Sequence, residues 1–276
     1  MQEFLHKIIF SLIAGFSEFL PVSAPAHQML YQHLTNHQAE PLLLLAVHLG
    51  CLVACWVSCG KRLKRLRRER KLLGNLKRHR GRQPDPALLT DGAILRTAAV
   101  PVVLGYLFYA KGTQWIGSIS MLSLVLFLGG VFLFIPRFLA RGNKDGRSLS
   151  PMDGLLMGLG GMLGALPGMS RMGCAYAMGV SRGAEPGYAQ EAVFILSIPA
   201  LLVMSCFDLY AAVTAGAGMT ALAFLSYLLA AVVSYVSGYL AIALLRHFAG
   251  KLNTADFAYY SWGLAFFTLL IYLIVH

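Results

Sequence analysis

Long apolar runs alternate with polar segments along almost the whole chain. Six of these runs come close to the roughly 17–25 residues that a helix needs to cross a bilayer. They occupy residues 41–59, 94–110, 119–136, 192–210, 219–245 and 256–275. The pattern therefore predicts an all-α polytopic membrane protein with six transmembrane helices.

Two further apolar stretches, residues 12–21 and 158–167, are too short to cross a bilayer, and each ends at a Leu-Pro pair followed by a polar loop. Non-helical polar backbone survives at membrane depth only where protein or a water-filled cavity supplies hydrogen-bond partners. We therefore expect two re-entrant helical hairpins, over residues 5–30 and 154–182, that share one site. The matching residues are Gly15, Leu20 and Pro21 in the first stretch and Gly161, Leu166 and Pro167 in the second.

One hairpin and three spans fall in each half of the chain, so we expect two repeats, residues 1–136 and 137–276. If each helix reverses the direction of the one before it, the two halves enter the membrane with opposite orientations. Inverted repeats of this kind place a shared site near the bilayer midplane.

Composition and charge agree with the membrane class. Hydrophobic residues make up 57% of the chain and charged residues 13%, against about 25% charged in soluble domains. The net charge is +11, and twelve of the 23 Lys and Arg residues lie in a predicted loop at 61–82. Such a block beside a span marks the cytoplasmic side and attracts anionic lipid headgroups. It has no aromatic platform, so nucleic acid is not an expected partner. Both termini are then predicted outside the cytoplasm.

The N-terminus has a second interpretation. Lys7, an apolar run over residues 8–16 and the triplet at 24–26 imitate a cleaved secretory signal peptide. Glu18 beside the apolar run, and the match with residues 158–167, favour a retained hairpin.

Polar side chains crowd both hairpin loops. Ionisable groups at membrane depth are costly and indicate function. Arginine suits phosphate oxygens, and serine hydroxyls with glycine-flanked amides complete an oxyanion cradle. Histidine can move a proton, while glutamate can orient it or hold a divalent cation. The candidates are Glu18, Ser23 and His27 in the first loop and Gly168, Ser170, Arg171 and Gly173 in the second.

Each candidate also has a structural explanation. A carboxylate can cap a helix, a histidine can sit at an interface, an arginine can reach the headgroups, and serines form turns. The occurrence of polar residues at both loops favours a phosphate site. Glu191 and Asp208 are further candidates to line its cavity, although interfacial placement explains them equally well.

At these loops the sequence resembles the undecaprenyl-diphosphate phosphatase family, the bacitracin-resistance type of membrane phosphatase. Its first motif is a glutamate, three residues, a second glutamate, Phe-Leu-Pro, Val or Ile, then Ser-Ser-x-Gly-His, which matches Ala14 to His27 here. Its second motif, Pro-Gly-x-Ser-Arg-Ser-Gly-x-Thr, matches Pro167 to Ala175. Departures from the two motifs are Ala14, Ala24, Ala26, Met172 and Ala175.

The resemblance implies a bacterial inner-membrane enzyme that hydrolyses a polyisoprenyl diphosphate to its monophosphate and recycles the cell-wall carrier lipid. It implies that Arg171 and Ser170 bind phosphate, that His27 is the acid–base or attacking group, and that Glu18 orients it or holds Mg²⁺ or Ca²⁺. The departures keep a second hypothesis open, a carrier or binder of lipid phosphate that does not cleave it. The sequence does not define the oligomeric state, and a dimer is one possibility.

Overall fold

The structure is a computed structural model that describes residues 2–74, 85–140, 142–216, 220–248 and 254–275. Within these ranges the chain forms α-helices, one short 3-10 helix and a single isolated bridge between Lys144 and Ala184, with no extended strand. The helices are α1 (Gln2–Phe19), α2 (Ala24–Thr35), α3 (Pro41–Gly74), α4 (Pro86–Tyr106), α5 (Tyr109–Trp115), α6 (Ile119–Phe134), η1 (Ile135–Phe138), α7 (Pro151–Leu163), α8 (Arg171–Ser181), α9 (Pro186–Thr214), α10 (Ala221–His247) and α11 (Thr254–Val275).

Six helical segments in the described part of the chain are long and apolar enough to cross a membrane. They are α3, α4, α6 with η1, α9, α10 and α11, which confirms the predicted number of spans. The chain is therefore a multi-pass helical membrane protein.

The predicted loop at 61–82 is wrong in its first part, because α3 continues as a helix to Gly74. Lys, Arg, Leu and Glu all favour helix, and no Gly or Pro interrupts this segment before Gly74. Glu69 holds the helix against the next one, since its carboxylate accepts a hydrogen bond from the Asp85 amide at 3.1 Å. The rest of the predicted loop, residues 75–84, lies outside the described residues.

The second span also starts earlier than its apolar run. The Asp85 carboxylate caps α4 by accepting a hydrogen bond from the Ala87 amide at 2.9 Å, and Pro86 occupies the first turn. The helix ends at Tyr106, and the predicted remainder to residue 110 belongs to the turn and to α5. The helix therefore starts before its apolar run, because the N-cap residue and the first-turn proline precede that run.

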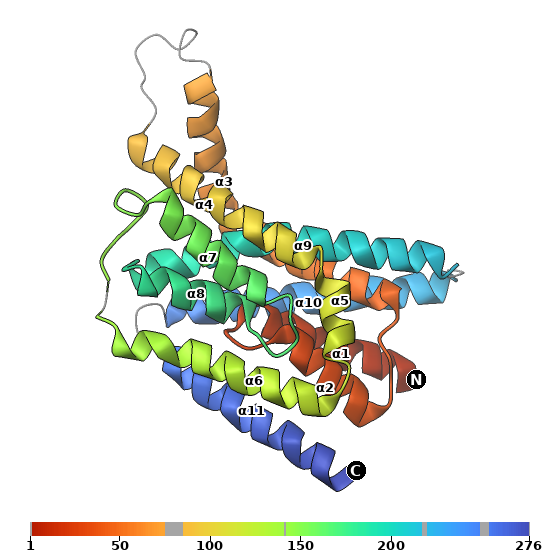
Figure 1. Ribbon diagram of the computed structural model, residues 1–276. Coiled ribbons are helices and arrows are strands. Elements are labelled where there is room, and N and C mark those ends of the chain that lie inside the picture. The colour runs from red at the N-terminus through yellow and green to blue at the C-terminus, as the bar shows by residue number, and fades with distance from the viewer. Residues whose placement is uncertain (1, 75–84, 141, 217–219, 249–253, 276) are drawn as a thin grey trace.

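Figure 1 shows the arrangement of the elements. Helices α6 and α11 lie side by side along one flank, and α3, α9 and α10 pack together on the other. The short pairs α1–α2 and α7–α8 lie between these flanks and approach each other with the loops at 20–23 and 164–170 (Figure 1). The two chain ends point to the same side of the molecule in this view.

Small residues let α1 approach α10 closely. A Cβ atom on Gly15 would lie 2.0 Å from the Ser237 hydroxyl oxygen and 2.7 Å from the Ser234 carbonyl oxygen. Such contacts replace the hydrophobic effect as the main source of helix association inside a bilayer. Packing of α1 onto α10 fixes the position from which Glu18 enters the centre of the molecule.

Candidate functional site

The two loops meet through a serine. Ser23 is the N-cap of α2, where its hydroxyl oxygen accepts a hydrogen bond from the Ala26 amide at 3.4 Å. The same oxygen accepts a hydrogen bond from the Gly168 amide of the other loop at 2.9 Å. Gly168 has a φ of +103°, a conformation that glycine adopts without strain. The contact joins segments that are far apart in sequence.

Ser170 has the equivalent place in the second pair of helices. It is the N-cap of α8, and its hydroxyl oxygen accepts a hydrogen bond from the Gly173 amide at 3.0 Å. The amides of Gly168 and Gly173, which the sequence suggested as donors to an oxyanion, are therefore already bonded to Ser23 and Ser170. In this arrangement both serines and both glycines shape the two loops.

Glu18 and Arg171 form a buried ion pair where the loops meet. The distance from Arg171 Nη2 to Glu18 Oε1 is 2.7 Å, and both side chains are only 5% exposed. The same nitrogen also lies 3.5 Å from the Glu18 carbonyl oxygen. A buried charge without its partner costs about 3–5 kcal/mol, so the pair ties α1 to α8 strongly.

The guanidinium group retains unused hydrogen-bonding capacity. Among the described residues, Arg171 Nε and Nη1 make no hydrogen bond of good geometry, although both atoms are buried and Tyr106 lies beside the guanidinium. Buried polar groups in native proteins nearly always have a partner, so free donors of this kind call for a specific explanation. A phosphate oxygen is the ligand that a guanidinium fork suits best.

His27 lies close to this junction and is held at both ring nitrogens. Its Nδ1 donates a hydrogen bond to the Ser23 carbonyl oxygen at 2.7 Å, and the Tyr260 hydroxyl lies 2.6 Å from Nε2. His27 belongs to α2, which is not one of the six spans. Burial lowers the pKa of its ring below the ordinary value, and the hydrogen bond to the Ser23 carbonyl oxygen only partly opposes this. The ring is therefore neutral at pH 7, with Nε2 accepting a hydrogen bond from the Tyr260 hydroxyl.

His27 also borders a large apolar hollow of about 500 Å³ between α1 and α11. Its walls are mostly hydrocarbon, while Ser17, His27, Asp256 and Tyr260 supply the polar groups. A hollow of this composition suits a ligand that is mostly hydrocarbon with one polar end. The lining residues are Leu12, Ile13, Phe16, Ser17, Leu20, Val22, His27, Asp256, Phe257 and Tyr260.

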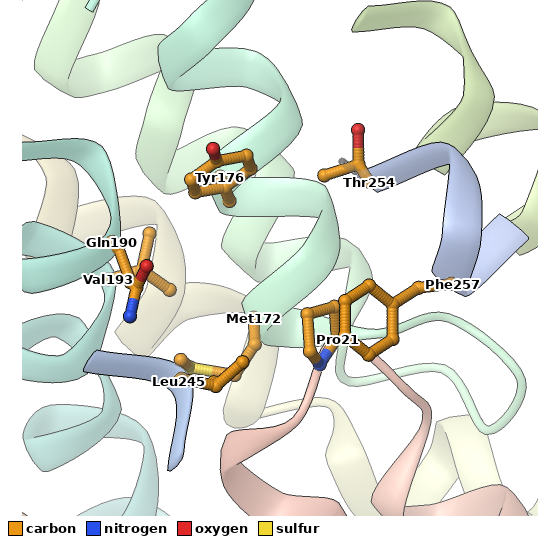
Figure 2. Close-up of a pocket in the computed structure, with 8 residues that line it drawn as sticks. All are labelled: Pro21, Met172, Tyr176, Gln190, Val193, Leu245, Thr254 and Phe257. Carbon is orange, nitrogen blue, oxygen red and sulfur yellow. The ribbon is translucent and has the colours of Figure 1, made fainter. Parts of the chain in front are cut away.

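A second, much smaller cavity of about 30 Å³ lies beside the loops (Figure 2). Pro21 from the first loop and Phe257 from α11 lie next to each other on one side, and Met172 of α8 points toward Leu245 on the other. Phe257 lines both cavities, so they are neighbours. The remaining lining residues are Tyr176, Gln190, Val193 and Thr254.

Glu191 does not join the two loops. It pairs with Arg246 of α10 through two hydrogen bonds, 2.6 Å from Nε to Oε1 and 2.8 Å from Nη2 to Oε2. Its neighbour Gln190 lines the smaller cavity instead. One step along the helix turns a side chain by about 100°, which separates these two residues.

The protein's own donors do not fit a resident site for Mg²⁺ or Ca²⁺. Ca²⁺ takes about six to eight oxygen ligands and Mg²⁺ about six. In the described part of the chain, no three His, Cys, Asp or Glu side chains gather at one point. The Glu18 carboxylate, the predicted ligand, faces the positive charge of Arg171 at 2.7 Å.

Sequence reasoning missed a second polar pair in the protein interior. His48 of α3 lies 2.5 Å from the Asp208 carboxylate of α9, measured from Nδ1 to Oδ2. The sequence suggested Asp208 as a cavity candidate but passed over His48, which lies inside an apolar run. The signal that could have found His48 is an ionisable side chain inside a predicted span.

These features define a polytopic helical membrane protein with a buried arginine–carboxylate site between two helix pairs and an apolar hollow beside it. The chain belongs to the family described as bacitracin resistance protein BacA, whose model matches residues 7–267.

Curated relatives cover almost the whole chain. A protein of Methanobrevibacter smithii named undecaprenyl-diphosphatase is 31% identical over 267 residues, which is 95% of each chain. Proteins of the same name from Nocardioides sp. and Alkaliphilus metalliredigens are 29% and 26% identical, and the matches cover 98% and 92% of this chain and 97% and 94% of theirs. The family resemblance expected from the two loop motifs is confirmed.

Proposed function

We propose that this chain hydrolyses undecaprenyl diphosphate to the monophosphate and inorganic phosphate, and so recycles the carrier lipid of cell-wall synthesis. The observation that carries the proposal is the buried guanidinium of Arg171 with two unpartnered nitrogens at the junction of the two loops. Membership of the family and the name shared by its relatives support the same activity. Arg171 would bind phosphoryl oxygens, and Glu18 would hold the guanidinium in place.

The apolar hollow suits the isoprenoid part of the substrate. Its hydrocarbon walls lie between α1 and α11, and His27 and Tyr260 form its polar border. A polyprenyl chain lying there would carry its headgroup toward the loops. The neutral His27 ring would take a proton from the attacking water as the terminal phosphorus–oxygen bond to the bridging oxygen breaks.

A divalent cation enters this proposal only together with the substrate. The diphosphate has the oxygen atoms that Mg²⁺ or Ca²⁺ requires, whereas the described residues bring no group of three His, Cys, Asp or Glu side chains together around such an ion. We therefore expect Mg²⁺ or Ca²⁺ to reach the site with the diphosphate rather than to be held by the protein beforehand.

In the proposed membrane topology, α1–α2 and α7–α8 are re-entrant hairpins in two inverted repeats, residues 1–136 and 137–276. A serine caps the second helix of each pair, and the two loops bond to each other across the repeats. The basic end of α3 would face the cytoplasm and contact anionic lipid headgroups, with both termini on the outer side of the bacterial inner membrane. Arg246 donates to the Ser58 carbonyl oxygen at 3.1 Å, which brings a second cationic helix end beside the basic segment.

Phosphate release tests the proposal. Purified full-length protein is expected to release phosphate from farnesyl and undecaprenyl diphosphate, and Arg171→Ala and His27→Ala are each expected to lose at least about 100-fold in rate. His33→Ala, at an exposed position of α2, is the matched control and should keep full activity. Absence of release from the wild-type protein in the presence of Mg²⁺ or Ca²⁺ would refute hydrolysis.

The second candidate is a carrier or binder of lipid phosphate that leaves its ligand intact. The observation that favours it is the loss of hydroxyl groups from the loops, with Ala24 and Met172 where the family motifs have serine. It predicts tight binding of undecaprenyl phosphate that depends on Arg171, without any phosphate release. Binding and release measured on the same preparation separate the two functions.

A further inference from the structure

A second histidine lies deep in the protein, on a different helix from His27. His48 of α3 is 1% exposed, and its Nδ1 lies 2.5 Å from an oxygen of Asp208 on α9. A carboxylate in this position accepts the Nδ1 proton and fixes the orientation of the ring. Neither residue belongs to the two loops.

The other ring nitrogen of His48 has no partner. Among the described residues, His48 Nε2 makes no hydrogen bond, and Nε and Nη1 of Arg171 make none of good geometry. All three atoms are buried. Nearly all buried polar atoms in native proteins are hydrogen-bonded. The three nitrogens without a hydrogen bond therefore need an explanation, and one ligand shared by all three would provide it.

A common explanation is supported by their surroundings. His48 interacts electrostatically with both Glu18 and Arg171, and Tyr109 interacts with Glu18, Arg171 and Asp208. The guanidinium carbon of Arg171 lies 5.7 Å from the centre of the Tyr106 ring, which stacks on Tyr109 with centroids 5.8 Å apart. The two charged pairs are therefore close enough to interact electrostatically, and we refer to them together as one buried cluster.

The charges of this cluster balance when His48 is protonated. Glu18 and Asp208 carry negative charge, and Arg171 and the imidazolium form of His48 carry positive charge. An imidazolium donates from both ring nitrogens, so Nδ1 stays with Asp208 while Nε2 can donate to an added anion. The free nitrogens of Arg171 can donate to the same anion.

We propose that His48 is a further phosphate-binding residue of the Arg171 site, held by Asp208 and donating from Nε2 to the phosphoryl group that Arg171 binds. The inference rests on the proposed function, because it assigns a role in binding the headgroup of the same lipid. It adds a residue from α3 to a site for which the sequence suggested the two loops, with Glu191 and Asp208 as further candidates.

Binding of farnesyl phosphate to the purified full-length protein tests this role. His48→Ala is expected to raise the Kd about 10- to 100-fold, the loss typical of a hydrogen bond to a charged group. His48→Gln should recover most of the affinity, because its amide nitrogen can donate from about the same place as Nε2. Asp208→Asn should weaken binding about 3- to 10-fold, since it loosens the ring without removing it.

A purely structural role makes different predictions. It predicts that His48→Ala and His48→Gln both lower the unfolding temperature and leave the Kd of the folded protein unchanged, which would overturn the proposal. An unchanged Kd in Asp208→Asn would overturn it as well, and this variant decides the matter if His48→Ala does not fold. His33→Ala is the matched histidine control and should bind like the wild type.

Failure of this inference is distinguishable from failure of the proposed hydrolysis. Phosphate release from farnesyl diphosphate by the wild type, with farnesyl phosphate binding that ignores His48, would refute the role of His48 and keep the enzyme. Binding that depends on His48 without any release would refute hydrolysis and keep the site.

Discussion

Two arginine–carboxylate pairs in this protein have the same chemistry and different surroundings. In the pair of Glu18 and Arg171 both side chains are 5% exposed, and one guanidinium nitrogen makes all the contacts. In the pair of Glu191 and Arg246 both side chains are 34% exposed. There the guanidinium makes two bonds to the carboxylate and a third to the Ser58 carbonyl oxygen.

The difference in burial and in hydrogen bonding indicates that the Glu191–Arg246 pair is structural, whereas the Glu18–Arg171 pair can still bind a ligand. Arg246 uses its donors on neighbouring protein atoms and joins the end of α10 to α3 and α9. Arg171 is more deeply buried and yet keeps two nitrogens without a partner. Since desolvating a charge is costly, a buried arginine with free donors is better explained by ligand binding than by stability.

The largest effect should follow removal of the carboxylate from the buried pair. Glu18→Ala leaves the Arg171 charge uncompensated and is expected to lower the free energy of unfolding by about 3–5 kcal/mol. Thermal unfolding in detergent and phosphate release measure the two consequences. Glu18→Gln keeps a hydrogen-bond acceptor and should lose less stability. Equal stability of Glu18→Ala and the wild type would contradict the pairing.

A smaller effect is expected where the loops are bonded to each other. Ser23→Ala removes both the N-cap of α2 and the acceptor for the Gly168 amide, at a cost of about 1–2 kcal/mol, and phosphate release should fall with it. Ser118→Ala is the control, since Ser118 caps α6 by accepting from the Met121 amide at 3.2 Å, a hydrogen bond in which neither loop takes part. It should lose about 1 kcal/mol of stability and keep its activity. Loss of activity in both variants would indicate general destabilisation.

The pH dependence of phosphate release should follow His27. Because burial lowers its pKa, a base at this position should keep its activity to lower pH than an ordinary histidine, whose pKa is about 6.5. Tyr260→Phe removes the hydroxyl that donates to the neutral ring, and this raises the pKa, so the acid limb of the rate profile should move to higher pH. An acid limb that stays in place would show that another group controls it.

The smallest effect belongs to the exposed pair. Arg246→Ala should lower the free energy of unfolding by about 1 kcal/mol or less, because solvent already screens the pair. Phosphate release should stay within about twofold of the wild-type rate. A loss comparable to that of Glu18→Ala would remove the distinction between the two pairs.

The sequence predicted much of this architecture correctly. Hydrophobic run length gave the six spans, since a helix must match the bilayer thickness, and the loop motifs gave the family. The boundaries were less accurate. Composition alone places charged residues in loops, whereas residues 61–74 continue α3 as a helix.

The candidate site was only partly predictable. The motifs identified Glu18 and Arg171, and the structure pairs them. Gly168 and Gly173 do not present the free amide donors that the sequence suggested, because the Gly168 amide donates to Ser23 across the two loops and the Gly173 amide donates to the N-cap Ser170. His48 was missed because its apolar neighbours made the segment look like an ordinary span.

The sequence by itself determined the membrane class, the number of spans and the candidate residues Glu18 and Arg171, because these depend on hydropathy and on motifs of short spacing. Only the tertiary structure decided which charges meet. Glu18 is far from Arg171 along the chain, and His48 is far from Asp208. Helix packing brings the members of each pair together, and pairing offsets the cost of burying each charge.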